Sequence, residues 1–224
     1  MKNKIVVISG GSGYLGRHIV SKLLNRGFIV FSINRKMPPE ERVPKDKNLH
    51  FFSADVSDGK ALKKISEVAK KIGKIRAVIH AASAPLVRRP ILENTMEEFR
   101  SQFFTNVFGC YELAKCFCPL MEAGSVVIAI TSDVTKSGRP YFVGGSYVPA
   151  KVALDSLMKI ISHELETKHI RTCIVSPAFM PGGLNSDMPE AVREFIMSKS
   201  KPEEISDPEK VATEVVELVC MTNR

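Results

Sequence analysis

Short apolar runs rich in β-branched residues alternate with longer stretches of helical apolar spacing along the chain. The runs are apolar throughout, which is typical of strands covered on both faces of a sheet. Strands separated by such helices predict βαβ units, so we expect an α/β fold with a doubly wound parallel sheet and helices on both faces. The expected strands are 5–8, 28–33, 49–53, 77–81, 125–130 and 171–175, and the expected helices are 14–26, 60–72, 96–117, 146–167, 189–199 and 207–220.

The composition fits one domain spanning 1–224, because no linker or internal repeat interrupts the pattern. Apolar residues make up 44% and charged residues 25%, as in ordinary globular proteins. No apolar run approaches the roughly 18 residues of a membrane span. The apolar run near Met1 leads into glycines and not into a cleavage site. We therefore expect a cytoplasmic protein with no membrane contact.

The formal net charge is +8, with 32 Lys and Arg against 24 Asp and Glu. These basic residues are dispersed among acids without an aromatic-basic recognition pattern, so we expect no nucleic-acid partner. A basic surface that partly faces an anionic cofactor explains the charge better. The five cysteines and five histidines show no metal-ligand spacing, which predicts reduced thiols and no metal site.

A glycine-rich turn joins the first expected strand to the first expected helix. Gly10, Gly13 and Gly16 follow a Gly-x-x-Gly-x-x-Gly spacing. Such glycines permit a tight turn and close approach of the backbone to a pyrophosphate, at a helix N-terminus that attracts anions. The pattern predicts a Rossmann-type dinucleotide site. Its expected cofactor-binding residues are Ser9, Gly10, Ser12, Gly13, Tyr14, Leu15 and Gly16.

The end of the second strand indicates which dinucleotide binds. A site for NAD usually places Asp or Glu here, against the ribose 2′-hydroxyl. This chain has Asn34, Arg35 and Lys36 instead, with no acid to repel a 2′-phosphate. A guanidinium can hold phosphate through two hydrogen bonds. We therefore expect NADP(H), with all three residues at the cofactor, although a plain pair of surface charges is the alternative.

Tyr147 and Lys151 lie four residues apart at the start of an expected helix. Residues at this spacing share a helix face, so the phenol and the ammonium can point the same way. A nearby cation favours phenolate, and we expect Lys151 to lower the pKa of Tyr147 toward the range where general acid–base catalysis works well.

Further motifs occur in order along the chain and complete a wider pattern. Together they resemble the short-chain dehydrogenase/reductase family across about residues 3–220. The motifs are the glycine turn, Asp55-Val56, His80-Ala81-Ala82-Ser83, Asn106-Val107-x-Gly109, Ile130-Thr131-Ser132, Tyr147-x-x-x-Lys151 and Ser176-Pro177-Ala178.

The resemblance implies a role for each matched residue. Tyr147 would exchange a proton with the substrate oxygen, Ser132 would hydrogen-bond that oxygen, and Lys151 would bind the nicotinamide ribose. Asn106 would hold a water in the proton relay to Lys151. The remaining implied cofactor contacts are Asp55 and Val56 at the adenine, Ala81, Ala82 and Ser83 along the ribose, and Pro177 at the nicotinamide.

Purely structural roles remain the alternative for several of these residues. Thr131 or Ser137 competes with Ser132, and Asp55 fits a strand-end or helix cap. Asn106 fits a residue that satisfies buried backbone. His80 stands where the family usually has Asn, and we read it as a packed or exposed imidazole.

Two departures from the family pattern bear on assembly and substrate. Tyr14 gives the glycine turn the look of the extended branch, which includes sugar-nucleotide epimerases, but the chain is too short for that branch's substrate domain. The chain stops at Arg224, where the classical fold adds a seventh strand used in one dimer contact. We therefore expect a homodimer through the helices that carry Asn106 and Tyr147.

We interpret the chain as an NADP(H)-dependent oxidoreductase acting on a small-molecule carbonyl or alcohol. The alternatives are a dinucleotide-binding regulatory protein without catalysis and a sugar-nucleotide-modifying member of the superfamily. The segment 179–207 is expected to form a mobile wall for the substrate, opposite 84–89. Its apolar members are Phe179, Met180, Leu184, Met188, Phe195 and Met197. At helical spacing such residues fit the core equally, so a place in the core is the alternative to a place in the pocket.

Overall fold

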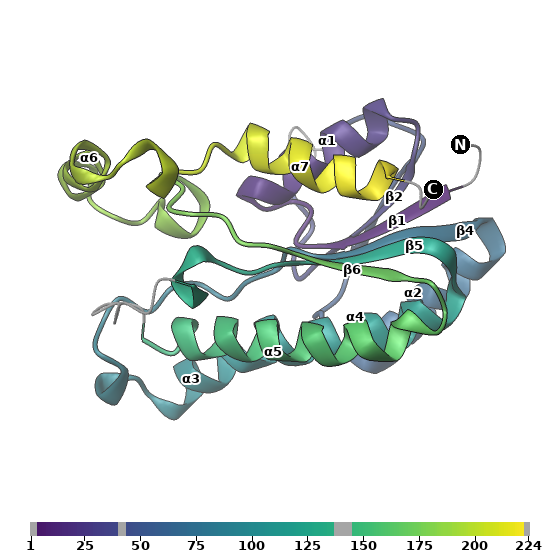
Figure 1. The fold of residues 1–224 in the computed structure, drawn as a ribbon, viewed down its shortest axis with the longest axis horizontal. Coiled ribbons are helices and arrows are strands. Elements are labelled where there is room, and N and C mark those ends of the chain that lie inside the picture. Colours follow the sequence, from purple (N-terminus) through teal and green to yellow (C-terminus); the bar gives the residue numbers. More distant parts are fainter. Residues whose placement is uncertain (1–3, 40–43, 137–144, 222–224) are drawn as a thin grey trace.

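A computed structural model describes residues 4–39, 44–136 and 145–221 of the chain. The described residues form a six-stranded parallel sheet in the order β3-β2-β1-β4-β5-β6 (Figure 1). This confirms the expected Rossmann-type α/β fold. The strands are β1 (Lys4–Ser9), β2 (Ile29–Asn34), β3 (Leu49–Ser53), β4 (Lys74–His80), β5 (Met121–Ile130) and β6 (Arg171–Val175).

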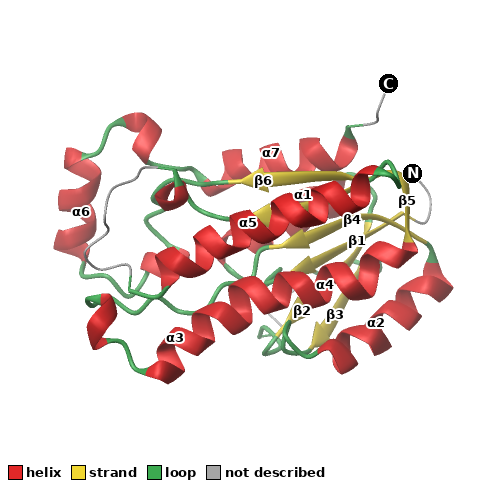
Figure 2. Cartoon of the chain, turned by 60° about the horizontal axis from the view of Figure 1, so that its bottom comes forward, coloured by secondary structure: helices red, strands yellow, loops and turns green. Residues whose placement is uncertain are grey.

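Helices cover both faces of this sheet. One face packs against α1 and α7, and the other packs against α2, α4 and α5, as Figure 1 and Figure 2 show from two directions. The helices are α1 (Tyr14–Asn25), α2 (Gly59–Ile72), α3 (Met96–Phe103), α4 (Gly109–Phe117), α5 (Tyr147–Glu166), α6 (Glu190–Lys199) and α7 (Pro208–Cys220).

Strand β1 shows why the apolar runs are continuous. Ile5 and Val7 point into the core beneath α2, α4 and α5, whereas Val6 and Ile8 point into the core beneath α1 and α7. All four side chains are fully buried. A strand with a core on each side needs apolar residues at every position, because successive side chains alternate between faces.

The strand order reverses between β1 and β4. The chain runs outward from β1 to β2 and β3, and then returns to β4 on the other side of β1. The connections that follow these two neighbouring strands therefore diverge at the carboxyl end of the sheet. In doubly wound folds a crevice opens at such a point and holds the ligand.

Two strands begin earlier than their apolar runs predicted. β4 starts at Lys74, directly after Gly73 ends α2, and β5 starts at Met121, ahead of an exposed polar stretch. The expected helix 96–117 is helical over its length but is interrupted by a π-turn, η3 (Phe104–Phe108), between α3 and α4. A π-turn holds a residue more than a regular turn and often lies at a functional site.

Within the described residues, no helix combines the length and apolar character that a bilayer crossing needs. In the same part of the chain, no three His, Cys, Asp or Glu side chains gather as a metal-binding group.

Candidate active site

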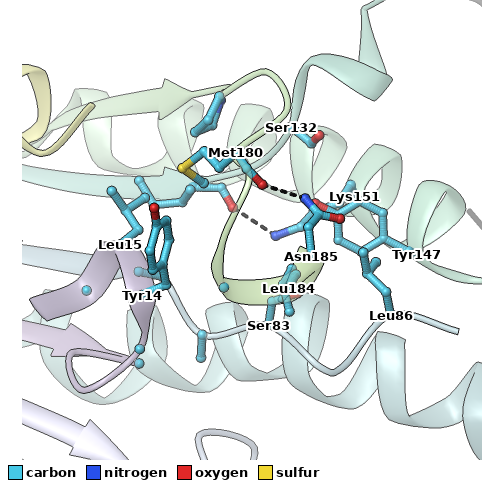
Figure 3. A pocket seen from close by; sticks show the side chains of 18 of the residues that line it. Tyr14, Leu15, Ser83, Leu86, Ser132, Tyr147, Lys151, Met180, Leu184 and Asn185 are labelled. Carbon is cyan, nitrogen blue, oxygen red and sulfur yellow. Dashed lines mark hydrogen bonds between the residues drawn. The ribbon is translucent and has the colours of Figure 1, made fainter. Parts of the chain in front are cut away.

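A cavity of about 1460 Å³ opens at the carboxyl ends of the strands. It is larger than the roughly 300–1,000 Å³ of a usual small-ligand pocket, so it has room for a dinucleotide together with a substrate. Figure 3 shows Tyr14 and Leu15 on one side of this pocket and Ser132, Tyr147 and Lys151 on the other.

Two glycines of the turn after β1 are required by close backbone contacts. Gly10 has a φ of +72°, and a Cβ there would lie 2.8 Å from the backbone of Ala82. A Cβ on Gly16 would overlap the carbonyl oxygen of Gly10. The turn can therefore fold back tightly and bring its backbone to the edge of the cavity.

The N-terminus of α1 faces this cavity without a side-chain cap. Its N-cap is Gly13, which makes no capping hydrogen bond, and the first helical turn contains no acid. The first amides of a helix have no partner within the helix, and they carry the positive end of its dipole. Tyr14, Leu15 and Gly16 line the cavity here, so this end of the site fits a pyrophosphate.

Asn34 fastens the glycine turn to the end of β2. Its Oδ1 accepts hydrogen bonds from the backbone amide and the hydroxyl of Ser12, both at 2.9 Å, while its Nδ2 donates to Ser32. Its side chain therefore links the glycine turn to β2 by hydrogen bonds. Arg35 and Lys36, which follow it, are exposed and line the cavity.

The remaining residues expected at the cofactor divide into two groups. Ser9 is fully buried and bonded to His80, and Asp55 is exposed and accepts hydrogen bonds from Ser57; neither lines the cavity. Direct cofactor contact by these two stays a prediction. The residues that do line it include Gly10, Ser12, Gly13, Val56, Ala81, Ala82, Ser83 and Pro177.

Tyr147 and Lys151 open helix α5 and face the same cavity. The Nζ of Lys151 lies 5.6 Å from the centre of the Tyr147 ring and donates a 2.9 Å hydrogen bond to the carbonyl oxygen of Ile130, at the end of β5. The phenol and the ammonium therefore lie on one face of the helix, as their spacing predicted.

The pKa of Tyr147 departs from our expectation in its direction. Burial raises the pKa of this phenol to about 12, the Ser132 hydroxyl opposes the increase, and the Asp133 carboxylate adds to it. We had expected Lys151 to lower this pKa. That expectation is wrong for the chain's own residues, because loss of water around the phenolate is the largest influence and Lys151 is not among the groups that shift this pKa.

Lys151 is also shifted by its surroundings. Burial lowers its pKa to about 8, and Cys110 and Asp155 act in the opposite direction. The side chain is only 3% exposed. At pH 7 this amine is therefore still mostly protonated, although its pKa lies only slightly above that pH.

Ser132 lines the cavity, as expected from its place after β5. It caps the short helix η5 (Asp133–Thr135), and its hydroxyl donates to Asp133 at 3.3 Å. The competing Thr131 hydroxyl is hydrogen-bonded to Ser176 at 3.0 Å. Ser137, the other competitor, lies outside the described residues. Of the two hydroxyls that can be compared, Ser132 is the one that acts on the Tyr147 phenol.

Asn106 lies in the π-turn η3 and is completely buried. Its Nδ2 donates to the backbone and side-chain oxygens of Gln102, at 2.9 and 3.0 Å, and its Oδ1 accepts from Ser83 at 3.1 Å. The carboxamide is thus used to hold Ser83, a cavity residue. Its expected part in a water relay to Lys151 stays a prediction.

Two contacts that the sequence did not predict close the cavity on the side of 179–207. The guanidinium of Arg88 donates to the Leu184 carbonyl at 2.7 Å and pairs with Asp187 at 3.0 Å. The Tyr14 side chain lies so close to Gly182 and Gly183 that a Cβ on either would collide with it, with the ring at Gly182 and with the Cβ of Tyr14 at Gly183. The adjacent glycines were the available signal for this second contact.

The segment 179–207 otherwise forms a wall much as expected. Phe179, Met180, Leu184 and Met188 line the cavity, and so do Leu86 and Arg88. The expected opposite wall 84–89 instead meets the segment 179–207 directly, through the contacts of Arg88 with Leu184 and Asp187. Phe195 and Met197 were wrongly expected to line this wall. They are 63% and 42% exposed and lie outside the lining, because α6 turns its face carrying Ile196 inward instead.

Residues 4–195 match the family model for short chain dehydrogenases. The chain is 27% identical to an uncharacterized oxidoreductase of Schizosaccharomyces pombe, over 97% of this chain and 90% of that protein. It is 23% identical to a 3alpha-hydroxysteroid dehydrogenase of Mediterraneibacter gnavus, over 95% and 88% of the two chains. The fold is similar to that of a dehydrogenase/reductase from Sinorhizobium meliloti, with a TM-score of 0.85 at 19% identity over 98% and 88% of the chains.

A doubly wound sheet with an uncapped glycine turn and a Tyr-Lys pair at one cavity defines a class of nicotinamide-dinucleotide oxidoreductases. The family match extends over most of the chain. The protein belongs to the short-chain dehydrogenase/reductase family.

Replacement of Lys151 by Met should stabilise the fold at pH 7 by about 3 kcal/mol. A shift from 10.5 to about 8 means that the folded state resists protonation of this amine. The unfolded chain binds more protons between these values, so wild-type stability rises with pH through this window and the advantage of Lys151→Met disappears.

Denaturant titrations at pH 7 and pH 10 measure this difference. Lys159→Met, an exposed change on the same helix, is the matched control and should show neither effect. A Lys151→Met protein that is less stable than wild type at pH 7 would contradict the prediction.

Proposed function

We propose that this protein is an NADP(H)-dependent oxidoreductase that reduces a small carbonyl compound to an alcohol, or catalyses the reverse reaction. The carrying observation is the convergence of Ser132, Tyr147 and Lys151 on the cavity that also receives the uncapped end of α1. A proton donor and a nucleotide cradle in one cavity are what hydride transfer to a carbonyl requires.

The choice of NADP(H) rests on the charges at the end of β2. Arg35 and Lys36 are exposed side chains on the cavity lining, and Asn34 between them and the glycine turn is neutral. A guanidinium with a nearby ammonium favours a 2′-phosphate, whereas a ribose hydroxyl gains little from either. When bound, the nicotinamide supplies or accepts the hydride.

In the direction of reduction, Tyr147 is the general acid. With its pKa raised to about 12 the phenol is protonated at pH 7, which is the form that can donate to the developing alkoxide. The Ser132 hydroxyl hydrogen-bonds the same substrate oxygen. As the proton leaves, the Lys151 ammonium stabilises the phenolate that forms. In oxidation the same atoms would move the proton in the opposite sense.

Replacement of Tyr147 by Phe should lower the rate of carbonyl reduction by at least ~10²-fold, the usual scale for a positioned acid. NADPH binding should be retained, because only the hydroxyl is removed. Initial rates with a carbonyl panel and a fluorescence titration with NADPH measure the two effects. Thr213→Ala, which removes an exposed hydroxyl on α7 away from the cavity, is the control. Undiminished turnover would remove Tyr147 from the mechanism.

Replacement of Arg35 by Ala should weaken NADPH binding and leave NADH binding nearly unchanged. One lost charge-assisted hydrogen bond to phosphate corresponds to about 1.5–3 kcal/mol, roughly a 10- to 100-fold change in Kd. Lys47→Ala removes an exposed charge that does not line the cavity, and it should change neither affinity. Equal losses for both dinucleotides would refute the choice of cofactor.

We further propose that the protein forms a homodimer through α4 and α5. Several large apolar side chains of the π-turn and of these two helices are exposed, whereas other residues of the same helices pack on the sheet. An apolar stripe of this kind is typical of an interface. Its members are Phe104, Phe108, Tyr111, Val152 and Ile160.

Replacement of both Phe108 and Ile160 by Glu should convert the dimer to a monomer, because two carboxylates would be buried at a symmetric contact. Light scattering after size exclusion measures the mass. Ile174→Glu changes an exposed apolar residue on the edge strand β6, away from these helices, and is the matched control. Dissociation by Ile174→Glu alone would instead assign the contact to the sheet edge.

A further inference from the structure

Tyr147 is the first residue of α5, so the way this helix begins decides where the phenol lies. The N-cap before it is Ser146, which is fully buried and has helical backbone angles, with φ −73° and ψ −8°. A serine normally caps a helix through its hydroxyl when its backbone is extended. The Ser146 hydroxyl makes no capping hydrogen bond and has no partner among the described residues. The usual means of fixing a helix start is therefore not used here.

The first backbone hydrogen bond of α5 is long. The amide of Ala150 donates to the carbonyl oxygen of Ser146 at 3.3 Å, whereas such bonds usually measure about 2.7–3.2 Å. The amide of Ser146 itself has no acceptor within the helix, because it lies at the helix start. A buried amide has to be paired elsewhere. The start of α5 thus depends on an acceptor from outside the helix.

Asn94 supplies this acceptor. Its Oδ1 accepts a 2.9 Å hydrogen bond from the amide of Ser146, which lies 52 residues further along the chain. In a capping box, the N-cap amide is bonded by a Glu or Gln at the third position of the helix. In α5 that position is Pro149, whose side chain has no acceptor. Asn94 therefore takes the place of a residue that the helix lacks.

The turn that leads into α5 also packs directly on Asn94. Gly145 has a left-handed φ of +45°, and a Cβ there would lie 2.7 Å from the Asn94 Oδ1 and 3.0 Å from the carbonyl oxygen of Val87. Glycine permits both this conformation and this close approach. The contact between Asn94 and the start of α5 is therefore built into the backbone on both sides of the hydrogen bond.

Asn94 is held in place by its own surroundings. Its Nδ2 donates to the carbonyl oxygen of Pro90 at 3.2 Å, and its backbone amide donates to that of Ile91 at 3.1 Å. The next residue, Thr95, begins α3 with a capping box that includes Glu98. An acceptor fixed in this way keeps one position relative to α3, so the amide that it binds is fixed as well.

We propose that Asn94 is a positioning residue for the reaction, whose Oδ1 holds the Ser146 amide and thereby sets the place of Tyr147. Asn94 is not among the residues that line the cavity, so it acts through the start of α5 and not on the substrate. The kinetic consequences of this inference rest on the proposed function. The hydrogen bond itself can be tested without turnover.

Two substitutions separate the acceptor of Asn94 from its bulk. Asn94→Asp keeps an oxygen for the Ser146 amide and loses the donor to Pro90. Asn94→Leu keeps a similar size and loses the acceptor. Ser146→Ala removes the unpaired hydroxyl but leaves the backbone amide, so it is the matched control at the other end of the bond. A role in packing alone would favour Leu over Asp, whereas the proposed role favours Asp.

Steady-state kinetics with NADPH and a carbonyl compound give the first test. Asn94→Leu should lose at least ~10-fold in kcat, because small misplacements of a catalytic group are costly, whereas Asn94→Asp and Ser146→Ala should stay within about 3-fold of wild type. The Kd for NADPH should change by less than about 3-fold in all three, since the glycine turn and α1 are untouched. Equal kcat losses for Asp and Leu, no loss for Leu, or a comparable loss in Ser146→Ala would overturn the proposal.

Hydrogen exchange at the Ser146 amide, followed by NMR, gives a second test that is independent of catalysis. The amide should be protected in wild type and in Asn94→Asp, and it should exchange at least ~10-fold faster in Asn94→Leu, where the helix start can open locally. Equal protection in all three proteins would overturn the proposal. If the exchange rates behave as expected and wild type reduces no carbonyl compound, the hold of Asn94 on α5 stands while the proposed function fails.

Discussion

The organisation of the site depends on keeping one ammonium group charged inside the protein. Lys151 is buried, and its only described hydrogen bond is to the carbonyl oxygen of Ile130 at the last residue of β5. Removal of an ammonium from water is costly, and a single neutral acceptor recovers only part of that cost. The lowered pKa of Lys151 is the visible result. The end of β5 must therefore stay within hydrogen-bonding distance of the Lys151 amine on α5 for that amine to stay protonated.

This constraint also explains why two oppositely acting features can coexist in one site. The phenol of Tyr147 is hard to ionise because the cavity wall removes much of the water around it, and the buried amine of Lys151 is hard to protonate for the same reason. In the proposed mechanism, a substrate oxygen that takes the proton from the phenol leaves a negative charge next to a positive one. The Lys151 ammonium would therefore stabilise the phenolate as it forms in the transition state more than it stabilises the neutral phenol before the reaction.

Local patterns predicted the fold and the identity of the cavity residues well. The glycine turn, Arg35 and the Tyr147–Lys151 spacing are each short-range signals, and the periods of apolar residues settle the layers. Starts of β4 and β5 were missed because Lys74 and the stretch after Met121 are polar there. The contact of Arg88 with Asp187 and the hydrogen bond of Asn106 with Ser83 join segments that are distant in the chain, so no local sequence pattern predicts them. The direction of the Tyr147 pKa shift was wrong because proximity of a cation can be read from spacing, whereas desolvation depends on the whole surrounding shell.

The packing of Tyr14 on Gly182 and Gly183 has a kinetic consequence. One aromatic ring belongs to the nucleotide cradle and also seats the wall over the substrate end. In the proposed function this shared contact couples the two ends of the cavity, and we expect the dinucleotide to bind before the carbonyl compound.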